Sequence, residues 1–400
     1  MRTDRMRTFS LLSLPIFILL AALWALGNTD SRANATKGSQ SFSQMWRLTQ
    51  PVTYENMTIF PIVAAQNPDT TAFVTLDDAL ASGDVVITEQ GSYLRRTRDG
   101  VRQVPYGSGP EVNQLVLVNR GKRPLILLAG EVVSGGKQDR IIGKDRIVPA
   151  GAVPLPLDVF CVEHGRWTGD SDKFSGAQLM VHPTVRKEAA IEQDQSKVWA
   201  AVRGQTTQAG NGLAARRGVA GSVLGGTLGS GQSSTAPPPI SPLRLDSTIA
   251  SEAPTQAYAK IYKSSPIGTT VESFAEEMQR RFQRVTEKMK GEHVVGVVIA
   301  YGGEVAWSDI FASSQLFDDY WPKLLRSYAV EALTRPEIRR VASLDDARDF
   351  LRPPTGHVHE ESDPGVYRWT EQNEGRITSI VLEALEPKPI TLHWLKVAKE

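Results

Sequence analysis

Short runs of mainly apolar residues, separated by polar turn residues, fill the chain between residues 52 and 167. Runs of this length that are bounded by glycine, proline, asparagine or aspartate predict β-strands. Thr75 is followed three residues later by an acid, which predicts a short helix over 75–80. The polar loop 119–123 is expected to join two strands as a hairpin. We therefore predict a mostly antiparallel β unit with strands at 57–63, 84–88, 112–118, 124–129, 141–148 and 153–162.

Beyond residue 184, apolar residues recur every three or four positions, which is the period of an α-helix. The clearest helix opens with a capping box at Thr269 and is expected to end at Gly291. Gly302 and Gly303 predict a tight turn between two strands. The fold class that we expect is α+β, with a mostly antiparallel β unit packed with several helices, plus a small C-terminal β segment. The helices are expected at 184–203, 269–289, 313–333 and 343–351, and the later strands at 294–300, 305–311, 366–370, 376–385 and 390–397.

Residues 1–27 have the pattern of an export signal. Arg2, Arg5 and Arg7 precede an apolar run from Leu11 to Leu26, as in a secretory signal peptide. An uncleaved membrane anchor is the alternative interpretation, although a spanning helix usually needs about 20 apolar residues. We expect a protein that is exported to the periplasm or the cell exterior, or one that this segment anchors to the membrane.

Composition divides the rest of the chain. Residues 28–51 are small and polar, which predicts a flexible lead-in. Residues 204–256 are rich in glycine, serine, threonine, alanine and proline, and they cannot bury enough apolar surface to offset the entropy of ordering. We predict that they form a disordered insertion in a single α+β core domain, which comprises 52–203 and 257–335. Residues 336–400 are expected to add a C-terminal helix and strands.

The charge balance limits the partners. The chain has 45 lysine and arginine residues against 44 aspartate and glutamate residues, a formal net charge of +1. A protein that binds nucleic-acid phosphates normally has a basic excess, so we expect no nucleic-acid partner. Membrane contact is expected only through the N-terminal segment. Because Cys161 is the single cysteine, no disulfide forms within the chain.

The segment from Gly130 to Arg140 follows an apolar run and is dense in charged and amide groups. Its two glycines, at 135 and 136, let the backbone turn sharply and let a ligand approach the N–H groups. Lys137, Gln138 and Arg140 could then hold a phosphate or a carboxylate. The alternative is a glycine hairpin with solvated charges.

The segment from Cys161 to Trp167 follows the next long strand. Arg166 adds positive charge, and Trp167 offers a face on which a sugar or a ring can stack. If the two strand ends are neighbours, Glu131 and Glu163 could face one another as a carboxylate pair for acid–base catalysis or for a divalent cation. The alternative is a salt bridge between Arg166 and a glutamate, buttressed by Trp167.

Three other residues are weaker candidates. Cys161 is expected to be a buried apolar thiol, because His164 lies three residues further along and so on the opposite face of a strand. His357 and His359 share one face of an extended chain, but they lie in a polar loop flanked by prolines and no third ligand is evident. We therefore predict no metal site.

A resemblance to a known family rests on four runs, at 130–140, 148–151, 161–167 and 321–328. They resemble a bacterial family that is named for its association with ADP-ribosylglycohydrolase and rhodanese-phosphatase proteins. The resemblance covers about residues 52–203 and 257–335. It implies a link to the metabolism of NAD or ADP-ribose through gene association.

Two hypotheses follow. In the first, the domain binds or processes a phosphorylated sugar or nucleotide that resembles ADP-ribose. In the second, the same residues form a rigid network in a non-catalytic module of the cell envelope with a structural or protein-interaction role. No cofactor is identified by the sequence. For the first hypothesis, the predicted catalytic residues are Glu131 and Glu163, and the predicted ligand-binding residues are Lys137, Gln138, Arg140, Arg166 and Trp167.

Overall fold

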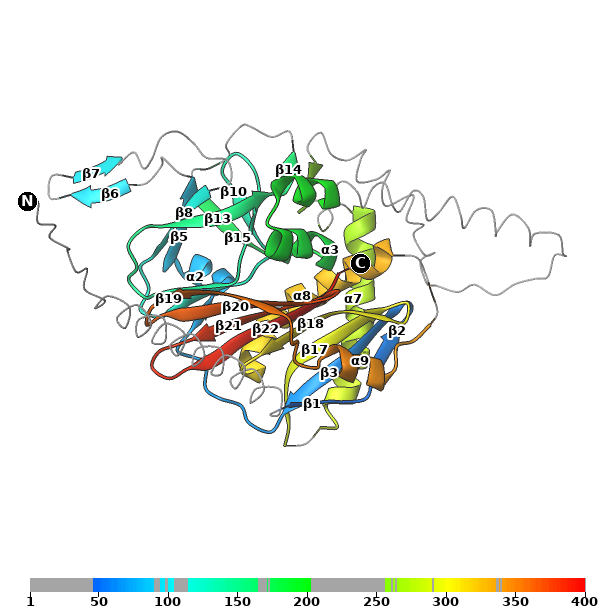
Figure 1. The fold of residues 1–400 in the computed structure, drawn as a ribbon. Helices are drawn as coiled ribbons and strands as arrows, with labels where there is room; N and C mark the ends of the chain where they lie inside the picture. The colour runs from blue at the N-terminus through cyan, green and yellow to red at the C-terminus, as the bar shows by residue number, and fades with distance from the viewer. Residues whose placement is uncertain are drawn as a thin grey trace, which may run out of the picture. The chain divides into compact units, whose positions relative to one another are not determined.

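Strands dominate the fold, and most of them form either a nine-stranded sheet or a small closed barrel (Figure 1). The predicted export signal and nearly all of the predicted insertion lie outside the described residues. The described residues from Arg47 onward form one compact unit. Among the residues described, no helix is long and apolar enough to cross a membrane. The computed structural model describes residues 46–89, 94–97, 100–103, 114–164, 171, 173–202, 256–259, 262, 265–289, 291–335, 338 and 340–399.

The nine-stranded sheet has the order β1-β3-β17-β18-β22-β21-β20-β19, and β2 also pairs with β3. Gly302 and Gly303, both with positive φ, form the predicted turn between β17 and β18. The C-terminal strands continue the sheet beside β18, so they share its core with strands that precede residue 335. Its strands are β1 (Trp46–Leu48), β2 (Val52–Tyr54), β3 (Met57–Ala64), β17 (His293–Tyr301), β18 (Glu304–Phe311), β19 (His357–Asp363), β20 (Tyr367–Glu374), β21 (Ile377–Ala384) and β22 (Ile390–Ala398).

Two segments that were predicted to be irregular are strands in this sheet. β1 lies within the predicted lead-in, and β19 occupies the polar loop that carries His357 and His359. β19 pairs with β20 along its full length, and its charged residues are typical of an edge strand. The His359 ring bonds Glu361 and lies against Trp369. In the part of the chain that is described, no group of three or more histidine, cysteine, aspartate or glutamate residues could hold a metal ion.

The barrel is closed by six antiparallel strands in the order β10-β11-β13-β8-β5-β15. Apolar side chains from every strand fill it, among them Ile87, Leu117, Val133, Ile142 and Val159. Two separate two-stranded sheets are formed by β6 (Leu94–Thr97) with β7 (Gly100–Gln103) and by β14 (Glu163–His164) with β16 (Gln256–Ala257). The barrel strands are β5 (Val85–Glu89), β8 (Gln114–Asn119), β10 (Glu131–Gly135), β11 (Arg140–Ile142), β13 (Leu155–Cys161) and β15 (Lys173–Met180).

The hairpin predicted around loop 119–123 does not form. β8 belongs to the barrel, whereas β9 (Leu125–Leu127) joins a separate sheet with β12 (Arg146–Val148) and β4 (Val74–Thr75). The Asn119 side chain explains the separation: its Nδ2 donates to the Arg123, Val148 and Pro149 carbonyls, and its Oδ1 accepts from the Gly121 N–H. These bonds direct the chain out of the barrel.

The predicted helices near 75–80, 313–333 and 343–351 are confirmed as α2 (Leu76–Ser82), α8 (Ser314–Thr334) and α9 (Leu344–Phe350), each with its serine or threonine cap. α7 (Ser265–Thr286) begins earlier than its capping box and ends before Gly291. The helix predicted over 184–203 is interrupted, because Gln193 adopts a left-handed conformation after α3 (Pro183–Lys187) and the π-helix η1 (Glu188–Glu192).

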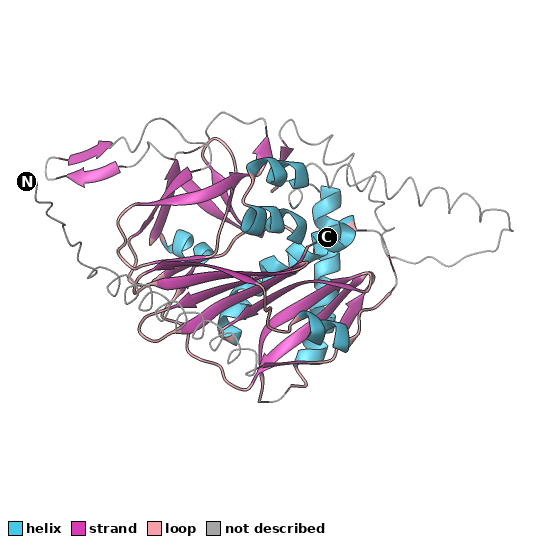
Figure 2. Cartoon of the chain, in the orientation of Figure 1, coloured by secondary structure: helices cyan, strands magenta, loops and turns pink. Residues whose placement is uncertain are grey.

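Helix α8 lies between the two main β structures (Figure 2). It contacts β17 and β18 of the large sheet on one side and β15 of the barrel on the other. Its apolar residues Phe317, Trp321 and Leu324 pack in the largest core cluster, together with residues of α7 and of the large sheet. The α+β class is therefore confirmed, with α8 as the element that joins the sheet to the barrel.

Candidate functional site

One face of α8 carries a stripe of buried polar residues. Lys323, Ser327 and Glu331 are spaced four residues apart, so they lie on one face of the helix. Each is buried, and each bonds a segment outside the helix. Ser327 Oγ donates to the Val181 carbonyl at 2.8 Å, and Glu331 accepts from the hydroxyl and the N–H of Thr184. The stripe therefore attaches the barrel side of the molecule to α8.

Lys323 holds the predicted catalytic residue Glu131. Its Nζ donates to Glu131 Oε1 at 2.6 Å and to Asp77 Oδ2 at 2.7 Å. The second carboxylate oxygen, Oε2, accepts from the Leu128 N–H at 2.7 Å. Burial raises the pKa of Glu131, although the Lys323 ammonium opposes that rise. Both carboxylate oxygens of Glu131 are therefore engaged by the protein itself.

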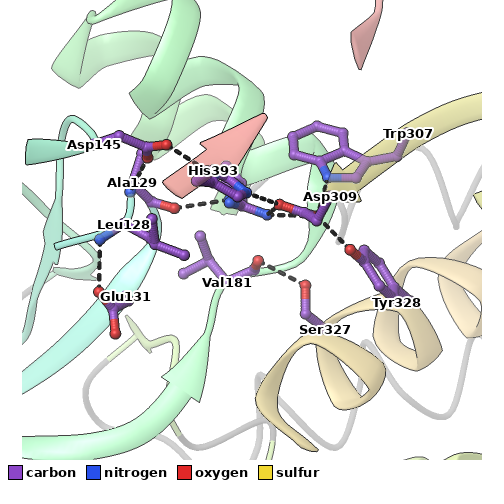
Figure 3. Close-up of polar contacts among 11 residues, drawn as sticks. Leu128, Ala129, Glu131, Asp145, Val181, Trp307, Asp309, Ser327, Tyr328 and His393 are labelled. Atoms are coloured by element: carbon purple, nitrogen blue, oxygen red, sulfur yellow. Dashed lines mark hydrogen bonds and ion pairs between the residues drawn. The ribbon is translucent and has the colours of Figure 1, made fainter. Parts of the chain in front are cut away.

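A second buried centre surrounds Asp309 of β18 (Figure 3). Arg186 Nη1 donates to both carboxylate oxygens, at 2.8 and 3.0 Å, and Trp307 Nε1 donates to Oδ2 at 2.7 Å. The Tyr328 hydroxyl donates to the same oxygen, and His393 Nε2 contacts Oδ1 at 2.9 Å. Burial opposes the charge of Asp309, but Arg186 and these hydrogen bonds outweigh it and hold the pKa of Asp309 well below its usual range.

His393 of β22 links Asp309 to a second acid. Its Nδ1 lies 2.6 Å from Asp145 Oδ2, and Asp145 Oδ1 accepts from the Ala129 N–H at 2.8 Å. Arg186 Nε donates to the Ala129 carbonyl, which closes the network. Burial opposes the charge of His393, but Asp145 and the two hydrogen bonds outweigh it and raise the pKa of the imidazole.

These residues come from five segments of the fold and lie away from solvent. We call Asp145, Arg186, Asp309, Tyr328 and His393 the ionic core; each is at most 2% exposed. Its members come from the loop before β12, from α3, from β18 and β22, and from α8. Because every charge has a partner of opposite sign at hydrogen-bond distance, the arrangement suits a structural clamp rather than a reacting group. No motif in the sequence marks any of these five residues as part of a polar centre.

The two polar segments singled out in the sequence meet at one end of the barrel. Arg140, which opens β11, pairs with Cys161, which closes β13. Gly135, which closes β10, pairs with Phe174 of β15. β5 ends there at Glu89. The two polar segments therefore meet at Arg140 and Cys161, but the strand before Gly130, β9, lies in a separate sheet and is not a neighbour of β13. We call this end of the barrel the rim, defined by Glu89, residues 135–140, Cys161 and residues 173–174.

The predicted site residues are only partly brought together. Glu131 begins β10, and the four residues to Gly135 place it roughly 13 Å from that glycine at about 3.3 Å per residue. Glu163 pairs with Ala257 through the backbone, and its side chain lies outside the described part of the chain, as do Arg166 and Trp167. The residues that gather at the rim are Lys137, Gln138 and Arg140.

Within that group, burial differs from residue to residue. Gln138 and Arg140 are buried, and Arg140 Nη1 donates to the Gln138 carbonyl at 2.8 Å and to its Oε1 at 3.3 Å. Lys137 is the accessible member, with 43% of its side chain exposed. Cys161 is buried, and burial raises the pKa of its thiol, which agrees with the expected inert role.

The glycine turn at the rim already holds an anion, which is the carboxylate of Glu89. The Lys137 N–H donates to Glu89 Oε1 at 2.7 Å, and the Lys137 ammonium lies 3.7 Å from Oε2. Gly136 has a φ of +54°, and a Cβ there would lie 2.8 Å from Glu89 Oε1. Glycine is thus required both by the turn and by the approach of the carboxylate. Glu89 was missed because it lies one residue beyond the predicted strand 84–88 and belongs to no motif of its own.

His182, at the start of α3, marks a third buried polar contact. Its Nδ1 lies 2.8 Å from the Tyr258 hydroxyl, which also accepts from the His182 N–H. Tyr258 stands two residues after the start of β16, in the segment that returns from the predicted insertion. Burial lowers the pKa of His182 to about 4. The neutral imidazole therefore fastens this returning segment to the barrel side.

The pKa of His182 predicts how stability depends on pH. Between about pH 4 and 6.5 the unfolded chain binds more protons than the folded chain, so stability should rise with pH across this window. We expect His182→Gln to remove up to roughly 3 kcal/mol of that rise. Urea denaturation of both proteins at several pH values measures it. An unchanged pH dependence in the variant would show that His182 titrates normally.

Comparison with known proteins identifies a family. A family model described as ARPP-1, the ARG and Rhodanese-Phosphatase-superfamily-associated Protein domain, matches residues 45–394. The match extends the resemblance found in the sequence to the C-terminal strands and therefore includes His393. No curated protein and no solved structure matches the chain.

Proposed function

The chain belongs to the family of ARG and Rhodanese-Phosphatase-superfamily-associated proteins, and we propose that it binds a small anionic ligand at the barrel rim. The ligand class is a phosphorylated sugar or nucleotide, for which ADP-ribose is the representative. Lys137 supplies an accessible charge, and Gln138 and Arg140 support the turn that carries it. Arg166 and Trp167 belong to the same proposal, because their segment leaves β13 at the rim.

The observation that supports this proposal most is the contact between the turn and Glu89. A backbone N–H and an ammonium converge on one carboxylate, as they do in sites that bind phosphate. Barrel ends are also common places for small ligands in proteins. The glycine turn therefore has donors that can hold an anion.

Binding without catalysis by Glu131 fits the geometry best. A general acid or base must reach the proton that it transfers at hydrogen-bond distance. Both carboxylate oxygens of Glu131 instead accept hydrogen bonds, one from Lys323 and one from the Leu128 N–H. Glu131 also lies at the other end of β10. Catalysis at the rim would need Glu163 or another group of that segment.

A second candidate function is a non-catalytic structural or interaction module. The ionic core favours it, because paired buried charges fix the barrel against the large sheet and so present a rigid surface. The two candidates share this framework and differ in whether the rim takes up a ligand. For either one, we propose action outside the cytoplasm or at the membrane, on the basis of residues 1–27. N-terminal sequencing of the mature chain tests that location.

Calorimetry of the full chain with ADP-ribose, AMP and ribose 5-phosphate tests the first candidate. Binding should release or absorb heat and raise the melting temperature, since a ligand at 100 times its Kd stabilises the folded state by about 2.7 kcal/mol. If none of the three compounds gives heat or shifts the melting temperature, the binding proposal is wrong and the structural candidate stands.

A further inference from the structure

We propose that the Glu89 carboxylate fills the anion-binding position of the Gly135–Lys137 turn when no ligand is bound, and that a phosphate group of the ligand replaces it there. The inference rests on the proposed function and names the atoms that would do the binding. They are the N–H of Lys137, which now bonds Glu89 Oε1, and the Lys137 ammonium.

The lengths of the two contacts show that the carboxylate fits the turn incompletely. Glu89 meets the Lys137 N–H at 2.7 Å, a full charge-assisted hydrogen bond, but its other oxygen remains 3.7 Å from the ammonium. The Glu89 side chain is attached to the end of β5, so its carboxylate has less freedom to arrange itself between the two donors than a free anion has. A free phosphate group has three outward oxygens and can meet both donors at hydrogen-bond distance.

The Glu89 carboxylate is also placed so that it can leave. About 20% of its side chain and 43% of the Lys137 side chain are exposed. Ion pairs with this exposure contribute little to stability because water competes for both partners. Glu89 is the last residue of its strand, so its side chain can rotate toward solvent without breaking the barrel.

The charge at the rim favours an incoming anion. Lys173 opens β15 next to Thr88 and is exposed. Among the described residues of the rim, the cations Lys137, Arg140 and Lys173 outnumber the acids Glu89 and Asp139. If Glu89 turns away, the positive excess at the turn grows. The site would then be selective for anions and would exclude cationic ligands.

The test uses lysine-selective ¹⁵N labelling of the full chain and a titration with inorganic phosphate. We expect the Lys137 amide resonance to shift, and Glu89→Ala to lower the Kd for phosphate by at least about fivefold, because it removes the competing carboxylate. Glu89→Gln keeps an acceptor for the N–H without the charge and should lie between the two. Adding Lys137→Ala to Glu89→Ala should weaken binding at least about tenfold. Lys122→Ala, at an exposed glycine–lysine turn outside the barrel, is the matched control and should change nothing.

The outcomes separate this inference from the proposed function. Suppose that ADP-ribose binds the natural chain, but the Lys137 amide resonance does not shift and Glu89→Ala leaves the Kd unchanged. The inference is then overturned, and the ligand binds elsewhere. If neither the natural chain nor Glu89→Ala binds phosphate or ADP-ribose, the proposed function itself is overturned. Equal losses with Lys122→Ala and Lys137→Ala would indicate general attraction to surface charge and would also overturn the inference.

Discussion

Replacing Asp309 with alanine is expected to destabilise the fold by about 3–5 kcal/mol, the usual effect of breaking a buried ion pair. The substitution leaves the Arg186 guanidinium buried without its carboxylate and removes the acceptor of Trp307 Nε1. It also leaves His393 with Asp145 alone. Urea denaturation at pH 7, followed by circular dichroism and tryptophan fluorescence, measures the loss.

Ser308→Ala is the matched control for this substitution. Ser308 is the preceding residue of β18 and is equally buried, but its hydroxyl has no hydrogen-bond partner among the described residues. We expect its free energy of unfolding to change by less than about 0.5 kcal/mol. If Asp309→Ala were as mild as Ser308→Ala, the ionic core would not be the clamp between barrel and sheet.

Replacing Lys323 with methionine is expected to destabilise the chain by about 3–5 kcal/mol at neutral pH, because Glu131 would remain buried without its cation. The loss should shrink in acid. Burial already raises the pKa of Glu131, and without the ammonium it rises further, so stability falls as pH rises through that value. Denaturation at pH 5 and pH 7.5 measures the difference.

Two further variants give this prediction its controls. Adding Glu131→Gln to Lys323→Met removes the stranded charge and should restore most of the lost stability. Lys396→Met changes another buried lysine, whose ammonium donates to the Arg352 carbonyl and whose pKa burial lowers to about 8. It should lose about 1 kcal/mol or less. Equal losses at Lys323 and Lys396 would argue against a specific role of the Glu131 pair.

The sequence predicted the local elements well because their signals are local. The caps at Thr75, Ser313 and Ser343 and the turn at Gly302 lie within a few residues of the elements that they bound. The ionic core could not be predicted in this way. His393 and Asp145 are 248 residues apart, and Arg186 and Asp309 are 123 apart, so only the tertiary fold shows that they meet.

A signal for the polar stripe of α8 was nevertheless present. Lys323, Ser327 and Glu331 recur every four residues in a helix whose other inward positions are apolar. That period indicates a second buried face. β19 was mispredicted for a different reason. Its charged residues suggested a loop, although they form an edge strand. Charge alone therefore distinguishes neither burial nor secondary structure in this chain.

Polar residues at the ends of predicted strands indicated where the candidate site lies. The length of β10 then showed that Glu131 does not belong to it. Gly135 closes β10 and Cys161 closes β13, and both strands pair with β11, so Lys137 and Arg140 lie at the rim. Glu131 was grouped with them because it precedes the glycines by few residues. In an extended strand those few residues carry it to the other end of the barrel.

The most direct test of the account compares Lys137→Ala with Glu131→Gln in calorimetric titrations with ADP-ribose. We predict that Lys137→Ala raises the Kd at least about tenfold, a loss of about 1.4 kcal/mol, because the ammonium contacts the anion. Glu131→Gln should keep the Kd within about twofold of the natural chain while lowering the free energy of unfolding. Loss of binding in Glu131→Gln, with full binding in Lys137→Ala, would contradict binding at the rim and would show that the ligand binds near Glu131.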